Sequence, residues 1–475
     1  MEKDSTLASH SIESRTENGD LADTKSIEDE LDPALNPLNW STSRKWVNLT
    51  LVTAQSILAS IGCTLLAVGA RDVSKDLHIT SPSISALPVA VYVLGLGFGP
   101  LYLAPLSEMY GRRNIYLVSF MSFTLLNVGC AFVTNKVGLI VLRFLAGLAS
   151  SAGPTIGGAT IGDLFRRAES GAAQAFYTLG PTLGPPLGGV FGAYIAQRGG
   201  WRWEMWALTI GSGILTVLCI LFLPETYKPF IHARSLGKRR ALAQIGFRRS
   251  LTRPIRILVL QPIVTIMSLY MAVVYGIFYL HVVTIPLLFG PVPMYGLFSY
   301  QWKDGNDGLA YLGVATGCSI ALVICFFTMN GAYRALCNKY QCQKPEFRTP
   351  YMQIGVFIIP VGLFIYGWTA EFKLHFGLPL FGACVFASGM LVTFISFQSY
   401  MVDAFGDYSA SALAAATVMR SIVGAVFCIS GQELYKGLGY GWGTSVLGFI
   451  SCMALPIPYL IWKYGERLRA KPFQL

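Results

Sequence analysis

Long apolar stretches alternate with short polar breaks along most of this chain. A helix needs about 20 apolar residues to cross the hydrocarbon core of a bilayer, which is about 30 Å thick. We place twelve predicted transmembrane helices at 46–70, 84–107, 114–133, 137–162, 170–194, 203–223, 260–289, 308–328, 350–369, 376–401, 409–432 and 441–462. The pattern therefore predicts an all-α membrane protein.

A basic segment divides the predicted helices into two groups of six. Residues 224–256 are rich in Lys and Arg, so we expect a cytoplasmic loop between an N-terminal bundle at 46–223 and a C-terminal bundle at 257–463. The polar tail at 1–45 lacks the features of a cleavable secretory signal and is expected to be disordered and cytoplasmic. The short tail at 464–475 is expected to lie on the same side. Paired six-helix halves around a site near the midplane are typical of secondary transporters.

Composition and charge agree with this topology. The chain is 53% hydrophobic and 13% charged, too apolar to be covered by a polar surface. Its net charge of +11 is spread over many loops, and the excess of Lys and Arg on one side follows the positive-inside rule. We therefore expect contact with membrane lipids, including anionic ones, and no nucleic acid partner.

Candidate chemistry other than transport is weak. Most of the ten cysteines lie inside apolar segments, where we expect them to act as small packing residues. Cys337 and Cys342 have no nearby histidine pair, so we expect no metal site and no cofactor. The sequence also lacks HExxH, GxSxG and Walker A patterns, which argues against an enzyme.

The fifth predicted helix contains the unusual stretch "GPTLGPPLGGVFG". Four of its glycines recur at every fourth position and share one helix face: Gly180, Gly184, Gly188 and Gly192. Small residues at this spacing allow two helix backbones to approach closely in a membrane, while Pro181, Pro185 and Pro186 remove backbone hydrogen bonds and bend the helix. The face is either a packing groove alone or part of a functional element.

Several charged residues lie inside or at the ends of predicted helices. An unpaired cation inside a bilayer costs from about 2.5 to more than about 10 kcal/mol, so Arg143 needs partners, water or a path to the membrane surface. Arg420 lies too deep to reach that surface easily and is expected to bind backbone carbonyls or to face a cavity. A further group at helix ends forms either a gate or a set of solvated charges: Glu108, Arg112, Arg113 and Asp163.

Candidate substrate contacts come from aromatic and amide side chains in the predicted helices. Tyr275 and Tyr279 are four residues apart, as are Phe394 and Gln398, so each pair shares a helix face. Tyr92 and Gln174 add polar edges. Aromatic walls with few polar groups suit an amphipathic organic molecule, although aromatic stripes in membrane helices also face lipid or serve packing.

Several motifs resemble those of the major facilitator superfamily, in particular the fungal twelve-helix drug:proton antiporters. "GPTLGPPLGG" is similar to the antiporter motif of helix 5, "APLSEMYGRR" to the loop 2–3 motif and "RFLAG" to the helix 4 motif. The segments "GWRWEMW", "PETY", "KPEFRTP", "DAFGDYSASALAA" and "YGERLR" are similar to other parts of this branch. The resemblance implies two pseudo-symmetric six-helix bundles, the major facilitator fold.

The resemblance also implies roles for particular residues. The antiporter motif would comprise Gly180, Pro181, Gly184, Pro185, Gly188 and Gly189. Arg143 would help to move protons, and the acids Glu108 and Asp163 would form an inner gate with Arg112 and Arg113. The chain departs from the pattern because Ala104 and Glu108 replace a glycine and an aspartate. In addition, predicted helix 46–70 contains no carboxylate, so the residue that carries the proton is not obvious.

These observations lead to one preferred function and several alternatives. We expect a monomeric exporter of drugs, toxins or secondary metabolites in the fungal plasma membrane, driven by proton antiport, with both termini cytoplasmic. An exporter of polyamines or organic acids and an uptake symporter on the same fold remain alternatives, as does a receptor-like sensor. The vacuolar membrane is the alternative location.

Overall fold

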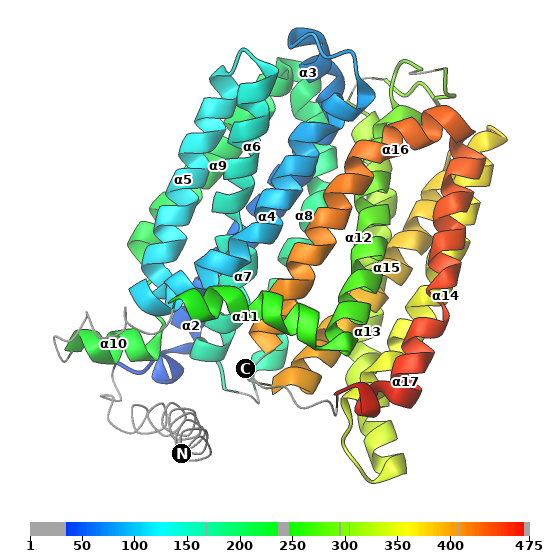
Figure 1. Cartoon of the computed structure of the whole chain (residues 1–475). Helices are drawn as coiled ribbons and strands as arrows, with labels where there is room; N and C mark the ends of the chain where they lie inside the picture. Colours follow the sequence, from blue (N-terminus) through cyan, green and yellow to red (C-terminus); the bar gives the residue numbers. More distant parts are fainter. Residues whose placement is uncertain are drawn as a thin grey trace, which may run out of the picture.

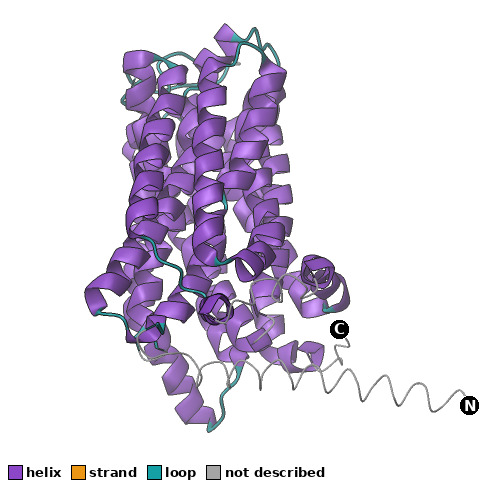
Figure 2. Cartoon of the chain, turned by 90° about the vertical axis from the view of Figure 1, so that its left-hand side faces the viewer, coloured by secondary structure: helices purple, strands orange, loops and turns teal. Residues whose placement is uncertain are grey.

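The computed structural model describes residues 35–166, 169–235, 247–293, 296–303, 305–406 and 409–469. Within these ranges the chain forms helices and short connections only. Most helices run roughly parallel to one another, and short helices lie at both ends of the molecule (Figures 1 and 2). Residues 1–34 of the predicted tail at 1–45 lie outside the described residues. The rest of this tail was expected to be disordered, but it contains a short 3-10 helix at Pro37–Asn39 and the start of a long helix at Thr42.

The helices of the first half form a bundle with one short helix at each end. Its helices are α2 (Thr42–Val68), α3 (Ala70–Asp76), α4 (Pro82–Tyr110), α5 (Arg112–Phe132), α6 (Lys136–Ser150), α7 (Ala152–Leu164), α8 (Ser170–Gly199), α9 (Trp201–Phe222) and α10 (Lys228–Ser235). The 3-10 helix η1 (Pro37–Asn39) precedes them. The predicted fourth helix is formed by α6 and α7, which meet at Ser151.

The second half begins with a helix that lies across the lower end of the molecule in Figure 1, α11 (Phe247–Leu260). The remaining helices are α12 (Pro262–Phe289), α13 (Tyr311–Tyr340), α14 (Thr349–Glu371), α15 (Gly377–Phe405), α16 (Ser409–Met453) and α17 (Pro456–Arg469), with the 3-10 helices η3 (Asp307–Ala310) and η4 (Pro345–Arg348). The segment 224–256 was expected to be a loop, but α10 and most of α11 lie in it. We call the end with α10, α11 and α17 the α11 end and the opposite end the α3 end.

Twelve passages through the molecule are present, as the sequence predicts. Ten helical segments are long and apolar enough to cross a membrane. The eleventh passage is α8, which is less apolar because of its glycines and prolines. The twelfth arises because the segment that contains α16 crosses the molecule twice. The chain reverses in α16 at Gly439, which has a φ of 73°, and the Glu371 carboxylate accepts a hydrogen bond of 3.0 Å from the Gly441 N–H beyond the turn.

The two halves are built alike and pack against each other. The first passage of each half packs on the fifth, α2 on α8 and α12 on α16. Contacts between the halves run from α4 to α16, from α8 to α13 and from α2 to α12. This is the predicted pair of pseudo-symmetric bundles. The exact bundle boundaries at 46–223 and 257–463 stay a prediction.

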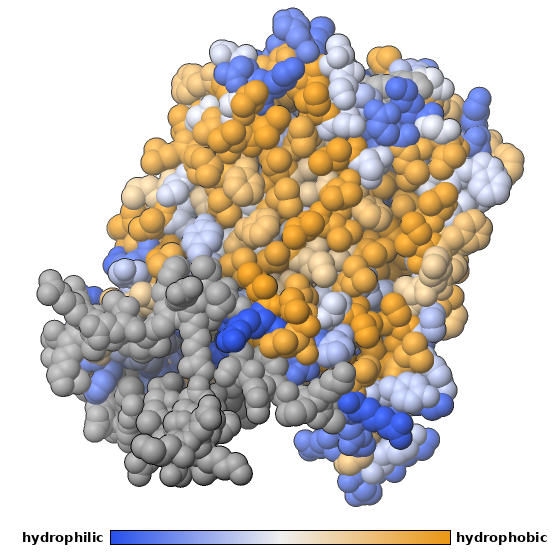
Figure 3. Space-filling view, in the orientation of Figure 1, coloured by the Kyte–Doolittle hydropathy of each residue, from blue (hydrophilic) through white to orange (hydrophobic). Residues whose placement is uncertain are grey.

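Apolar side chains cover the flanks of the molecule. The space-filling view shows a broad hydrophobic band between more hydrophilic ends (Figure 3). On α5, for example, Val118, Leu125 and Phe132 are 60–69% exposed. A surface of this kind is stable against lipid and not against water.

Candidate functional site

The glycine face of α8 packs on α2 along its whole length. A methyl group on Gly184 would lie 2.3 Å from the Ser60 Cβ, and one on Gly188 would lie 2.2 Å from the Thr64 Oγ1. Gly180 and Gly192 face α2 in the same way. The Thr64 hydroxyl donates a 2.6 Å hydrogen bond to the Pro185 carbonyl. The four-residue spacing therefore places two helix backbones in close contact, as predicted.

Gly189 faces the other bundle. A methyl group there would lie 2.4 Å from the Tyr311 ring, and one on Gly308 would lie 2.4 Å from the Ala193 Cβ. The Tyr194 hydroxyl also lies 3.4 Å from the Asn306 Oδ1. These contacts between α8 and the start of α13 close the α3 end of the molecule.

An aromatic cluster surrounds Arg420 where the two bundles meet. The Arg420 guanidinium carbon lies 4.7 Å from the centre of the Tyr275 ring and 5.1 Å from that of Phe394, distances at which a cation is attracted to the ring face. The Tyr275 and Tyr279 hydroxyls are 3.3 Å apart. The Cys63 thiol of α2 donates a 3.1 Å hydrogen bond to the Tyr279 hydroxyl, so this cluster spans both bundles. We call these five residues the Arg420 cluster.

The other predicted substrate contacts lie elsewhere. Tyr92 is fully buried, and its hydroxyl donates to the Ala59 carbonyl and the Ser150 hydroxyl, each at 2.8 Å. Gln174 is exposed near the α11 end of α8, and Gln398 is half-buried on α15. Tyr275, Tyr279 and Phe394 are therefore brought together, and the remaining three predicted contacts are not.

Arg143 is fully buried and does not extend toward the membrane surface. Its Nη2 donates to the Gly62 carbonyl of α2, and its Nε donates to the Pro88 carbonyl of α4 at 3.4 Å. The guanidinium carbon lies 4.3 Å from the centre of the Tyr92 ring. Arg143 thus joins three helices, and the alternative of a snorkelling side chain is wrong.

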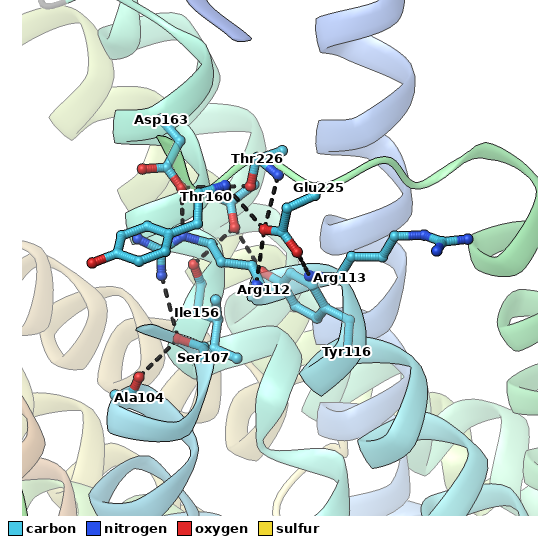
Figure 4. Close-up of polar contacts among 11 residues, drawn as sticks. Ala104, Ser107, Arg112, Arg113, Tyr116, Ile156, Thr160, Asp163, Glu225 and Thr226 are labelled. Atoms are coloured by element: carbon cyan, nitrogen blue, oxygen red, sulfur yellow. Dashed lines mark hydrogen bonds and ion pairs between the residues drawn. The ribbon is translucent and has the colours of Figure 1, made fainter. Parts of the chain in front are cut away.

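A charged cluster at the α11 end joins α5, α7 and the segment after α9 (Figure 4). The Arg112 Nε forms an ion pair with Asp163. The Glu225 carboxylate accepts hydrogen bonds from the backbone N–H groups of Arg112, at 2.9 Å, and Arg113, at 3.2 Å. Because these are the first N–H groups of α5, Glu225 caps that helix.

The remaining predicted gate residues lie near this cluster. The Arg113 Nε donates to the Leu223 carbonyl at 2.6 Å. Glu108 is exposed at the end of α4 and is acted on electrostatically by Arg112 and by Arg253 of α11. The burial of Glu225 raises the pKa of its carboxyl above the usual value, and the backbone N–H groups partly oppose this rise.

The second bundle repeats the charged cluster. The Arg348 Nε lies 2.8 Å from the Asp403 Oδ2, and the Arg469 Nη2 lies 2.6 Å from the Glu346 Oε1. Like Arg112, Arg348 lies at the start of the third helix of its bundle, and like Asp163, Asp403 lies near the end of the fourth. Asp163 was predicted as a gate partner of Arg112, whereas the equivalent pair of the second bundle, Arg348 and Asp403, was not predicted from the sequence.

Two buried groups were missed or misjudged from the sequence. Glu204 in "GWRWEMW" is fully buried near the start of α9, although its place beside two tryptophans suggests only a helix end at a membrane interface. His281 of α12 is 1% exposed. Neither of its nitrogens has a hydrogen-bond partner among the described residues, and its ring packs on Tyr366 and Phe386 inside the second bundle.

Comparison with known proteins identifies relatives over nearly the whole chain. The model of the Major Facilitator Superfamily matches residues 52–427. The MFS-type transporter penM of Penicillium rubens is 38% identical over 92% of this chain and 88% of its own length. The efflux pump radE of Floropilus chiversii is 38% identical over 93% of this chain and 84% of its own.

Solved structures show the same fold at low identity. The xylose transporter XylE of E. coli, in a partially occluded inward open conformation, superposes with a TM-score of 0.68. It is 14% identical, and the match covers 89% of this chain and 98% of that one.

Proposed function

Because the chain belongs to the Major Facilitator Superfamily and is a transporter rather than an enzyme, we propose that it exports amphipathic organic compounds in exchange for protons. The observation that carries this proposal is the Arg420 cluster, which places a cation and three aromatic rings between the two bundles. Such a surface suits a planar or amphipathic organic molecule. The names of relatives such as the efflux pump radE support export.

The distribution of charge supports an orientation for the protein. The α11 end carries the basic helix α11 and the arginines that begin the third helix of each bundle, so the positive-inside rule favours a cytoplasmic α11 end. Both termini then face the cytoplasm, and we infer the plasma membrane as the location. We further propose that the protein works as a monomer.

The contacts between the bundles support alternating access. The packing of Gly189 and Gly308 closes the α3 end, whereas no atom of the described residues lies within 4 Å of a methyl group placed on Gly158 or Gly162 of α7, so the glycine side of α7 faces open space. The structure in this orientation is closed to the outside. Export then requires the α8–α13 contact to separate, while the two charged clusters hold the α11 ends of the helices.

The proposal is tested in proteoliposomes that contain a pH-sensitive dye. A pH gradient is imposed, and a panel of lipophilic cations, polyamines, organic acids and polyketides is added. For one-for-one electroneutral exchange, a gradient of one pH unit is expected to drive about tenfold accumulation of an exported compound, with protons moving the opposite way. Protein-free liposomes and a protonophore are the controls.

The direction of proton movement separates the alternatives. Protons that move in the same direction as the compound would identify an uptake symporter and contradict export by antiport. Flux of polyamines or organic acids alone would keep the antiport mechanism but replace the proposed class of substrate.

A further inference from the structure

One carboxylate inside the first bundle has no hydrogen-bond partner among the described residues. Glu204 of α9 is 0% exposed, and neither of its carboxylate oxygens has a hydrogen-bond partner among the described residues. A charged carboxylate in a low-dielectric interior is strongly unfavourable without hydrogen bonds or a counter-charge. A protonated, neutral Glu204 avoids this cost in the present conformation. A charged Glu204 needs a conformation in which the carboxylate gains a partner.

The Glu204 carboxylate lies against the glycine that separates α2 from α3. A methyl group on Gly69 would lie 2.7 Å from both carboxylate oxygens, so the glycine between α2 and α3 makes room for this side chain. Arg143, which binds the Gly62 carbonyl on the same helix α2, acts on Glu204 electrostatically. The Arg143 Nη1 also has no hydrogen-bond partner among the described residues.

A cavity of about 200 Å³ lies at the α3 end near this carboxylate. Its lining includes Arg71, Asp72, Gln197, Asp307 and Gln432, so its walls are polar enough to hold water. Val68 and Ala70 line the cavity, and Gly69 between them lies against the Glu204 carboxylate, so the cavity and the buried carboxylate are close.

Charged and titratable groups of three other helices act on Glu204 or are acted on by it. Arg143 of α6 and Asp72 of α3 act on it, and Glu204 in turn acts on Tyr311 at the start of α13. Arg143 is a counter-charge for the carboxylate, whereas burial without a hydrogen bond disfavours the charge. Movement of α8 and α13 at the α3 end would change the exposure of Glu204 to water, and with it this balance.

We propose that Glu204 is the residue that binds and releases the exchanged proton, with Arg143 as its counter-charge. This inference rests on the proposed proton antiport. The neutral acid is the form in the present conformation, in which the α3 end is closed. When the α3 end opens, water from the cavity reaches the carboxyl, and the proton equilibrates between its oxygen and that water. When the α11 end is open instead, the O–H bond breaks, the proton leaves to water on that side, and the carboxylate pairs with Arg143.

The first test measures protonation directly, with the proton as the probe. Infrared difference spectra of the purified full-length protein are recorded between acidic and alkaline pH. Because every protonated Asp and Glu contributes a C=O band, the wild-type spectra are compared with those of Glu204→Gln, which is expected to lose one titrating carboxylic acid C=O band. The matched control Glu433→Gln, which changes an exposed acid at the α3 end, is expected to keep the band. A band that persists in Glu204→Gln overturns the proposal.

A second variant keeps the Glu204 carboxyl, so the test does not depend on the folding of Glu204→Gln alone. Gly69→Ala introduces a methyl group against both oxygens and leaves the carboxyl in place, so the titrating band is expected to remain but to shift in frequency or midpoint. An unchanged band in Gly69→Ala shows that the band does not arise from Glu204 and contradicts the proposal.

The second test separates this inference from the proposed function. The panel compounds that move protons with the wild-type protein are applied to Glu204→Gln in the same proteoliposomes. Loss of at least tenfold of the proton movement supports the inference, and full retention overturns it. If the wild type itself moves no protons with any compound, the proposed antiport fails, while the infrared result still decides whether Glu204 binds a proton.

Discussion

Replacing Gly188 by leucine is expected to prevent the first bundle from folding. The added side chain would meet the Thr64 hydroxyl and the Ile61 carbonyl of α2, which lie 2.2 and 2.7 Å from the position of a Cβ. A backbone carbonyl cannot move aside like the end of a flexible side chain. Overpacking of a tight interface costs typically about 1–3 kcal/mol and occasionally more, and this interface also holds the Thr64–Pro185 hydrogen bond.

The measurement is the yield of monodisperse protein by size-exclusion chromatography, together with its thermal unfolding in detergent. The matched control is Gly158→Leu, because a methyl group there meets no atom of the described part of the chain within 4 Å. We expect the control to be recovered like the wild type and Gly188→Leu to be lost or to unfold at a clearly lower temperature. Equal stability of the two variants would show that the α2–α8 contact is not close.

Replacing Arg420 by leucine is expected to abolish most of the transport. The Arg420 guanidinium faces the rings of Tyr275 and Phe394, and a desolvated cation–π contact contributes about 2 kcal/mol. A loss of this size corresponds to roughly a 30-fold fall in rate or affinity. Arg420→Lys keeps the charge but loses the planar surface, so we expect an intermediate effect.

The readout is the initial rate of export of the compounds that the wild type exports, normalised to the amount of folded protein. Lys436→Leu is the control, because it removes an exposed cation near the other end of the same passage of α16. A rate for Arg420→Leu within twofold of the control, in protein that is equally well folded, would remove Arg420 from the transport site.

The sequence predicts the passages and the glycine face well because each depends on a local pattern. Helix length follows from the thickness of the bilayer, and residues four apart lie on the same face of any helix. For this reason the twelve passages and the contact between the α8 glycines and α2 both agree with the structure. The same reasoning places Tyr275 and Tyr279 together.

The sequence does not show which helices pack against each other. For this reason it did not predict the contacts of several buried residues correctly. Tyr92 is polar at its tip, but only the three-dimensional packing shows that its ring lies under Arg143. Glu204 and Glu225 become notable through burial and through contacts with residues far away in the chain. Neither the spacing nor the composition of "GWRWEMW" and "PETY" indicates those contacts.

The predicted basic loop was misjudged for a different reason. In α11, Pro254 and Ile257 are buried while Ile255 and Val259 are exposed, so its apolar residues are shared between the bundle and the surface. A count of Lys and Arg emphasises the charge of this segment and not the helical spacing of its apolar positions.

The central claim is that the two bundles separate at the α3 end during transport, and a distance across that contact tests it most directly. Spin labels are attached at Tyr194→Cys and Asn306→Cys, whose native side chains lie 3.4 Å apart, in a background without reactive native cysteines. Their separation is measured by double electron–electron resonance at several pH values and with an exported compound. The account predicts a short and a long distance whose proportions change with pH and with the compound. A single short distance under all conditions, in labelled protein that still transports, would contradict it.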